Sequence, residues 1–341
     1  MRRFKDVHVK NGNLLLQVEN LKTYFFFREG TLRAVDGVNF DIRRGETLGI
    51  AGESGCGKSV TSQSILRIVP KSGRIVDGKI LFDPDDKGTV DLVQLKAHGR
   101  QMRQIRGAKI SMIFQEPMVS FSPVYTIGNQ ISEVIMLHQN CSRKEAREKT
   151  IELLGKVGLP KANQNIDAYP FNLSGGMRQR AMIAMALSCQ PSLLIADEPT
   201  TAVDVTIQAQ VLELIKQLQE DLDMGLIFIT HDLAVIAELC DKVLIMYLGK
   251  NMEYASVEEI FYNSKHPYTK GLLDSIPKLG KGSRQKIDPI AGSVPSPYNK
   301  PSGCPFYPRC PQIIPGLCDK KEPPSIEIKE HHTVSCFLYQ K

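Results

Sequence analysis

A glycine-rich segment between an apolar run and a helical pattern constrains the fold of this chain more than any other feature. Residues 52–59 read Gly-Glu-Ser-Gly-Cys-Gly-Lys-Ser and fit the pattern G-x-x-x-x-G-K-S/T without deviation. The preceding residues 47–51 are typical of a buried strand, and residues 60–66 predict a helix. Such a loop directs backbone N–H groups at phosphates beside the positive end of the helix. The sequence therefore predicts an α/β protein that binds a nucleotide triphosphate.

The loop residues have separate expected roles. Lys58 would reach the β- and γ-phosphates, and the Ser59 hydroxyl would bind Mg²⁺. The rest of the segment would contact the nucleotide: Gly52, Glu53, Ser54, Gly55, Cys56, Gly57 and Val60. An unrelated glycine-rich turn is the alternative, which the flanking strand and helix and the acidic residues downstream disfavour.

Apolar runs recur along the chain with helical patterns between them. Strands are expected at residues 14–18, 35–40, 110–114, 193–196, 226–230 and 243–246, and residues 127–157 are expected to be mainly helical. Alternation of this kind predicts a mostly parallel sheet covered on both faces.

Polar residues stand at the ends of three of these expected strands. Asp197 and Glu198 follow residues 193–196, Gln115 follows residues 110–114, and His231 comes just after residues 226–230. Parallel sheets place their ligands at the carboxyl ends of the strands. We therefore expect Asp197 in the Mg²⁺ shell, Glu198 polarising the attacking water, Gln115 touching the metal or the water, and His231 in the same site.

A second glycine motif, Leu-Ser-Gly-Gly-Met at residues 173–177, precedes an expected helix at residues 178–188. Ser174, Gly175 and Gly176 would form another anion-binding site at a helix N-terminus. One nucleotide does not easily need two such sites from one chain. The motif is therefore predicted to close over a nucleotide held by a second copy or a homologous partner.

Together these segments resemble the nucleotide-binding domain of ABC transporters, over about residues 14–262. Residues 52–59 resemble the Walker A loop, Gln115 the Q-loop, residues 173–177 the signature motif and residues 193–198 Walker B. Ala202-Val203-Asp204 resembles the D-loop and His231 the switch histidine. The resemblance implies a P-loop NTPase core similar to RecA, an antiparallel β subdomain and a helical subdomain at about residues 118–190. It also implies that Asp204 contacts the nucleotide site and that Tyr24 or Phe25 stacks on adenine.

Residue 177 narrows the resemblance, because the signature motif usually ends in Gln and Met177 stands here. This variant is similar to the D-type ATPase subunit of dipeptide and oligopeptide importers. Residues 266–273 and 303–310 look like the C-terminal extension of that family, which would occupy residues 263–341. The resemblance implies a peripheral protein on the cytoplasmic face of the membrane, with two ATP molecules sandwiched between two ATPase subunits. The expected partners are a homologous F-type ATPase subunit or a second copy, two permease subunits and, indirectly, an extracytoplasmic peptide-binding protein.

Four of the eight cysteines crowd the last forty residues: Cys304, Cys310, Cys318 and Cys336. This segment lacks the apolar content for a core of its own, so it needs the body, a partner or a metal to order it. Four thiolates suit Zn²⁺ or an iron–sulfur cluster, and the resemblance favours a 4Fe–4S cluster. His331 and His332 would be substitutes for a cysteine ligand, although exposed histidines are the simpler expectation.

Composition excludes little. The net charge of +6 is mild, no apolar run is long enough to span a bilayer, and the polar N-terminus does not predict a secretory signal. Alternatives to peptide uptake are an importer for nickel or a sugar, an iron–sulfur carrier, and a non-transport ATPase acting on nucleic acid or ribosomes. The short interval between Gln115 and residue 173 leaves no room for a long coiled coil, and the chain has one phosphate loop. No nucleic-acid partner is therefore expected.

Overall fold

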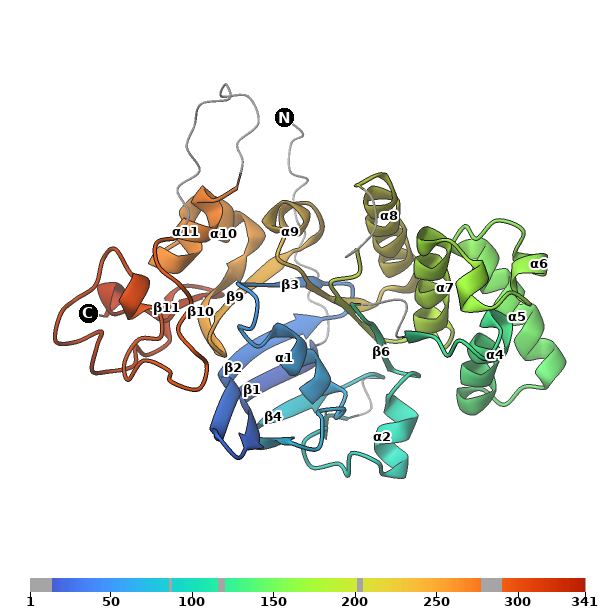
Figure 1. The fold of residues 1–341 in the computed structure, drawn as a ribbon, viewed down its shortest axis with the longest axis horizontal. Coiled ribbons are helices and arrows are strands. Elements are labelled where there is room, and N and C mark those ends of the chain that lie inside the picture. The colour runs from blue at the N-terminus through green and yellow to red at the C-terminus, as the bar shows by residue number, and fades with distance from the viewer. Residues whose placement is uncertain (1–13, 86–87, 116–119, 201–204, 277–289, 341) are drawn as a thin grey trace, which may run out of the picture.

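The computed structural model describes residues 14–85, 88–115, 120–200, 205–276 and 290–340. Within these ranges the chain forms a large mixed sheet, a smaller antiparallel sheet, a group of helices at one end and a C-terminal extension at the other (Figure 1). No helix in these ranges is both long and apolar enough to cross a membrane.

The large sheet is built around five parallel strands. They are β3 (Thr47–Ala51), β6 (Ile110–Ile113), β7 (Leu193–Asp197), β8 (Gly225–Ile229) and β9 (Lys242–Tyr247), in the spatial order β9-β3-β8-β7-β6. β3, β7 and β8 are buried along their whole lengths, which explains their continuous apolar runs. The predicted parallel sheet is therefore confirmed.

Two buried clusters lie on the two faces of this sheet. One face packs against α8 (Val205–Leu222), α9 (Leu233–Leu239) and the helices beyond them. The other face packs against α1 (Lys58–Ile65) and the antiparallel sheet. Figure 1 shows the sheet between these two layers. The arrangement fixes the loop after β3 and the ends of β6, β7 and β8 on a rigid frame.

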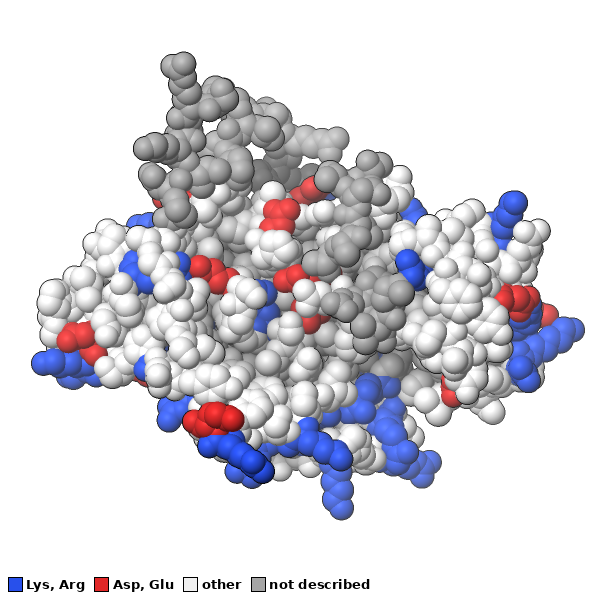
Figure 2. Space-filling model, in the orientation of Figure 1, with Lys and Arg blue, Asp and Glu red and all other residues white. Residues whose placement is uncertain are grey.

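The antiparallel sheet has the order β2-β1-β4-β5. Its strands are β1 (Leu14–Phe27), β2 (Gly30–Arg43), β4 (Gly73–Phe82) and β5 (Val90–Asp91), and the short helix α2 (Arg100–Ile105) follows. Lys and Arg gather along the edge of the molecule formed by this region in Figure 2. Exposed Lys71, Arg74, Lys79, Arg100 and Arg103 come from it. Much of the excess positive charge on the viewed face lies there.

The helices between β6 and β7 lie together at one end of the molecule (Figure 1). They are α4 (Ile127–His138), α5 (Arg143–Lys156), α6 (Ala162–Asn165) and α7 (Gly175–Leu187), with a 3₁₀ turn at Pro170–Asn172. The expected helical stretch at 127–157 is interrupted because α5 starts afresh at Ser142. The hydroxyl of Ser142 accepts the Glu145 N–H, and the Glu145 carboxylate accepts the Ser142 N–H. This reciprocal cap ends the loop and orients α5.

The C-terminal extension packs on the body through strand pairing and apolar contact. β10 (Lys250–Ser256) pairs antiparallel with β9 and with β12 (His332–Val334), and β11 (Ile326–Lys329) completes the sheet. The helices α10 (Val257–Asn263) and α11 (Pro267–Asp274) and the 3₁₀ turns Tyr307–Arg309 and Phe337–Tyr339 lie around it. Tyr268 and Phe306 belong to the same buried cluster as the parallel sheet. The body is therefore one of the supports that this apolar-poor segment needs.

The histidines of the extension differ from the sequence prediction. His331 is exposed, as expected, but His332 is buried, and its Nε2 lies 2.8 Å from Oε1 of Glu253. The expectation of an exposed His332 was wrong. The sequence did not show that β12 would pair with β10, which brings His332 next to the buried carboxylate of Glu253.

Candidate nucleotide site

The glycine-rich loop connects β3 to α1, as the sequence predicts. Gly52 and Gly57 have φ values of +149° and +105°. A Cβ on either glycine would collide with a backbone carbonyl, that of Met246 at Gly52 and that of Ala34 at Gly57. Glycine is therefore required at both positions by conformation and by space. The loop passes close to β9 and β2 and presents its backbone at the start of α1.

Lys58 is buried at the first turn of α1, and its ammonium group lies back over the loop. Its Nζ donates to the carbonyl oxygens of Gly52 at 2.7 Å and Glu53 at 3.3 Å. Both acceptors are neutral, so the positive charge is not cancelled by an ion pair in these contacts. The amine is placed to exchange these carbonyls for phosphate oxygens, to which a cation binds more strongly.

Asp197 ends β7 and is 4% exposed. Burial raises the pKa of its carboxyl group and the neighbouring Glu198 adds to the rise, whereas the Ser59 hydroxyl and Lys58 oppose it. Its Oδ1 atom is buried without a hydrogen-bond partner. An unpartnered carboxylate oxygen beside a serine hydroxyl is an arrangement of hard oxygen donors that suits Mg²⁺.

Glu198 brings together the two other polar residues predicted at strand ends. Its Oε2 accepts a hydrogen bond from Nε2 of Gln115 at 3.0 Å, and its Oε1 lies 3.4 Å from Nδ1 of His231. The backbone of Glu198 is left-handed, with φ of +46°, and its N–H donates to the Ile229 carbonyl. This uncommon conformation turns the chain sharply after the strand, next to Asp197. The side chains from β6, β7 and β8 therefore meet at one edge of the sheet.

The second glycine motif lies elsewhere in the chain. Ser174 caps α7, with its Oγ accepting the Met177 N–H at 3.3 Å, and both Ser174 and Gly175 are exposed. A Cβ on Gly175 would meet no atom within 4 Å. Figure 1 shows α7 among the helices at one end of the molecule and α1 beneath the central sheet. The motif is therefore open to a second molecule and does not join the loop of its own chain.

Two further sequence predictions concern the edges of the site. Asp204 lies outside the described residues.

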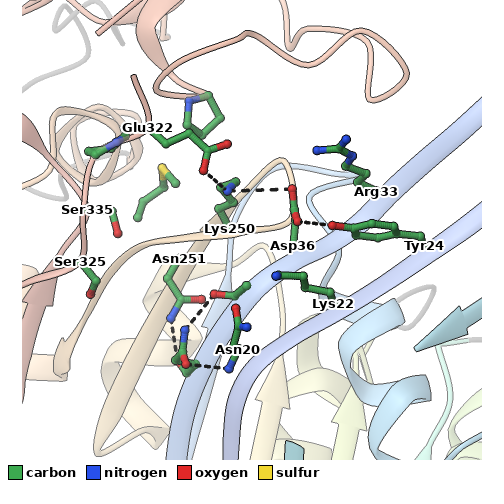
Figure 3. A pocket seen from close by; sticks show the side chains of 15 residues that line it. Asn20, Lys22, Tyr24, Arg33, Asp36, Lys250, Asn251, Glu322, Ser325 and Ser335 are labelled. Carbon is green, nitrogen blue, oxygen red and sulfur yellow. Dashed lines mark hydrogen bonds and ion pairs between the residues drawn. The ribbon is translucent and has the colours of Figure 1, made fainter. Parts of the chain in front are cut away.

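Tyr24 lines a cavity of about 460 Å³ between the antiparallel sheet and the extension, and its hydroxyl donates to Asp36 at 2.6 Å (Figure 3). Burial and this bond raise the pKa of Tyr24 to about 12. Phe25 instead stacks on Phe27. The two candidates for adenine stacking thus have different surroundings, one polar and one aromatic.

The four C-terminal cysteines are free thiols, and Cys310, Cys318 and Cys336 all lie near enough to Cys304 to raise its pKa. The Cys304 N–H donates to the Cys318 carbonyl at 2.8 Å, and Cys318 Sγ accepts the Ile314 N–H. The pKa of Cys304 is raised to about 12, mainly by burial, with smaller contributions from Cys318, Cys336 and Cys310. Among the residues that the structure describes, however, no three or more His, Cys, Asp or Glu side chains are arranged to hold a metal ion. The prediction of a metal-bound extension is not supported by this arrangement.

Sequence reasoning missed two residues that touch the phosphate loop. Arg309, in the extension, binds the carboxylate of Glu53 through two nitrogens, and the Tyr268 hydroxyl accepts the Glu53 N–H. Both residues stand in segments that carried the family resemblance, residues 266–273 and 303–310. No local periodicity signals a contact with residue 53, which is more than 200 positions away.

Known proteins match nearly the whole chain. The family described as ABC transporter matches residues 35–201, and the oligopeptide/dipeptide transporter C-terminal region matches residues 252–318. The chain is 51% identical to the oligopeptide transport ATP-binding protein AppD of Bacillus subtilis, covering 96% of this chain and 97% of the relative. It is 48% identical to the dipeptide transport ATP-binding protein DppD of the same species, covering 95% and 94%.

Solved structures agree on the fold. The dimeric bacterial ABC transporter cassette MJ0796 matches with a TM-score of 0.63 and 25% identity, covering 71% of this chain and 99% of that one. The protein cbiO1 of Clostridium perfringens matches with a TM-score of 0.59 and 27% identity, covering 74% and 92%. The P-loop fold, the ordered site residues and the two matched regions lead to one conclusion: the chain belongs to the ATP-binding proteins of the oligopeptide and dipeptide ABC transporter family.

Proposed function

We propose that this chain is the ATP-hydrolysing subunit of a membrane importer for dipeptides or oligopeptides. The observation that carries the proposal is the position of Glu198, which contacts Gln115 and His231 beside the buried Asp197. Relatives that are similar over nearly the whole chain are named for oligopeptide and dipeptide transport. The alternative cargoes, nickel or a sugar, would use the same ATP site.

In the mechanism that we propose, the loop and Lys58 would bind the triphosphate, and Ser59 and Asp197 would hold Mg²⁺. The metal, when bound, neutralises charge on the phosphate oxygens. Glu198 orients the attacking water and accepts its proton, while Gln115 and His231 hold the Glu198 carboxylate in place. His231 is 68% exposed and Glu198 is 16% exposed, so closure over the nucleotide would remove water from His231 and strengthen its contacts. Tyr24 or Phe25 would stack on adenine, and Asp204 would contact the site.

The exposed motif at Ser174, Gly175 and Gly176 would bind the γ-phosphate of an ATP held by a second ATPase subunit. The first turn of α7, whose N–H groups have no partner within the helix itself, would supply backbone donors for this purpose. We propose a homologous F-type subunit as the partner, with a second copy of this chain as the alternative. Two membrane permeases would dock on the helical subdomain near Gln115, on the cytoplasmic face, and a peptide-binding protein outside the cell would deliver the cargo.

The test replaces Glu198 with Gln, which keeps the size of the side chain and removes its basicity. We expect hydrolysis to fall by about 100-fold or more, given the usual contribution of general-base catalysis, with ATP still bound. Glu152→Gln, on the exposed face of α5, is the matched control and should hydrolyse ATP at the wild-type rate. Unchanged turnover in Glu198→Gln would refute the assignment.

The same variant identifies the partner. Since ATP is retained, Glu198→Gln should trap a closed dimer, which size-exclusion chromatography detects. Dimerisation of the chain alone with ATP would establish a homodimer. Dimerisation only with a co-expressed homologous ATPase would establish the heterodimer that we propose.

We also propose that Cys304, Cys310, Cys318 and Cys336 hold a 4Fe–4S cluster, with Zn²⁺ as the alternative. The support is the chemistry of four thiols gathered in one region, where the other three raise the pKa of Cys304. A bound cluster would hold this coreless segment together. Iron and acid-labile sulfide in equal amounts after anaerobic purification would support the cluster, and one zinc per chain would support the alternative. Neither metal, or a yield unchanged by Cys318→Ser relative to the control Cys141→Ser, would refute the proposal.

A further inference from the structure

The C-terminal extension reaches back to the phosphate loop through one arginine. Nη1 of Arg309 lies 2.7 Å from Oε2 of Glu53, and Nη2 lies 3.0 Å from Oε1, a two-bond pair between residues 256 positions apart. The Arg309 side chain is 5% exposed. Its other bonds go to the Tyr247 hydroxyl and to the carbonyls of Ile290 and Ala291. The guanidinium group is therefore fixed in one orientation.

Glu53 is held through its backbone as well. Its N–H donates to the hydroxyl of the buried Tyr268 at 3.0 Å, and its carbonyl oxygen accepts a bond from Nζ of Lys58 at 3.3 Å. Tyr268 packs against Tyr247 and Phe306, with ring centroids 4.7 and 5.2 Å away. The extension thus supports the second residue of the loop from a rigid aromatic group, while the carboxylate of that residue meets Arg309.

The pair does more than attach the extension to the body. Attachment is already provided by the pairing of β10 with β12 and by the buried contact of His332 with Glu253. Glu53 also carries a negative charge within a loop whose backbone is arranged to receive a polyanion. Without a counter-charge, this carboxylate would repel the phosphates, and a free carboxylate would compete for the N–H groups that should bind them.

Resting on the proposed ATPase function, we propose that Arg309 is a positioning residue for the phosphate loop. It neutralises Glu53 and holds the carboxylate away from the phosphate site, so that the C-terminal extension sets the affinity of the loop for ATP. Lysine would replace the charge but not the two-bond geometry. Arg309 directly precedes Cys310, so the turn that carries one of the gathered thiols also carries this contact.

The test measures the ATP affinity of the full-length chain, with KM and kcat taken in the complex with its partner subunits. We expect Arg309→Ala to raise Kd and KM for ATP by about tenfold, the scale of one charge-assisted pair, with kcat at saturating ATP retained. Arg309→Lys should show a smaller rise. Removing the carboxylate as well, in Glu53→Gln/Arg309→Ala, should recover much of the lost affinity, since the repulsion is then absent.

Lys329→Ala is the matched control, because Lys329 and Glu259 form another ion pair between the extension and the body, at 2.7 Å. Its ATP affinity should equal that of the wild type. Wild-type affinity in Arg309→Ala would overturn the inference, as would a double variant that binds ATP no better than Arg309→Ala. A wild-type chain that neither binds nor hydrolyses ATP would instead overturn the proposed function.

Discussion

Phe306 offers the sharpest test of how firmly the extension is joined to the rest of the molecule. It is 1% exposed, and its ring lies 5.4 Å from that of Tyr247, 5.2 Å from that of Tyr268 and 5.9 Å from that of His266. Tyr247 ends β9 of the parallel sheet, whereas Tyr268 belongs to α11. Replacement by Ala would therefore open a cavity at the boundary between sheet and extension.

The expected loss follows from these contacts. A buried Phe→Ala change costs about 3–5 kcal/mol of unfolding free energy, and each aromatic pair accounts for about 0.5–1.5 kcal/mol beyond the buried area. We expect Phe306→Ala to lose about 4 kcal/mol in a single transition, since the ring contacts both parts. The chain has no tryptophan, so urea unfolding is best followed by far-ultraviolet circular dichroism.

A solvent-facing residue of the same extension provides the control. Leu338 is 42% exposed, and Leu338→Ala should stay within about 0.5 kcal/mol of the wild type. The reasoning is refuted if Phe306→Ala loses less than about 1 kcal/mol. It is refuted equally if the main transition is unchanged and a separate early step appears, because the extension would then unfold independently of the sheet.

Three further predictions concern the site and its surroundings. Asp197→Asn should raise the Mg²⁺ concentration needed for half-maximal hydrolysis by about tenfold or more, because one negative ligand is lost. A Mg²⁺ titration of the hydrolysis rate measures this shift. Ser174→Ala should leave ATP binding to this chain's own loop unchanged and slow hydrolysis of the partner's ATP, measured by single-site turnover in the complex; slowing only at its own loop would contradict the half-site assignment. Burial lowers the pKa of His266 to about 4, so the folded protein takes up this proton less readily than the unfolded chain does. The contribution of His266 to stability is therefore complete above pH ~6.5, and the protein should lose up to about 3 kcal/mol of unfolding free energy as the pH falls toward 4. His266→Asn, which retains an acceptor for the Tyr268 N–H now bound by the histidine, should flatten the urea-unfolding profile in that range, and an unchanged profile would contradict the assignment.

The central fold was predictable because its signals are local. A buried parallel strand such as β7 is a continuous apolar run, and the acids that follow it occupy the edge where such sheets bind ligands. The meeting of Glu198 with Gln115 and His231 follows from that rule alone. The backbone conformation of Glu198 does not, because a left-handed glutamate has no sequence signature.

The docking of the extension was not predictable, because the contacts that fix it join residues far apart in the sequence. β11 (Ile326–Lys329) alternates apolar and polar residues over only four positions, and β12 (His332–Val334) has three residues and a single apolar side chain. Segments this short do not predict that β12 pairs with β10. The partner of Arg309 is chosen by tertiary structure from all the acidic residues in the chain. Charge patterning along the sequence identifies neither that partner nor the burial of His332.

The two glycine motifs of the chain are supported in opposite ways, and the difference fits their proposed roles. Residue 53 of the phosphate loop is fixed by Arg309, Tyr268 and Lys58, and the loop lies against β2 and β9. The motif at Ser174 has an exposed cap and an open approach over Gly175. A site that binds ATP first benefits from being formed in advance, since little ordering is then needed on binding. A surface that must engage and release another subunit's ATP in every cycle benefits from being accessible. The C-terminal extension strengthens this asymmetry, because its contacts with residue 53 are made on the loop that we propose holds the chain's own nucleotide.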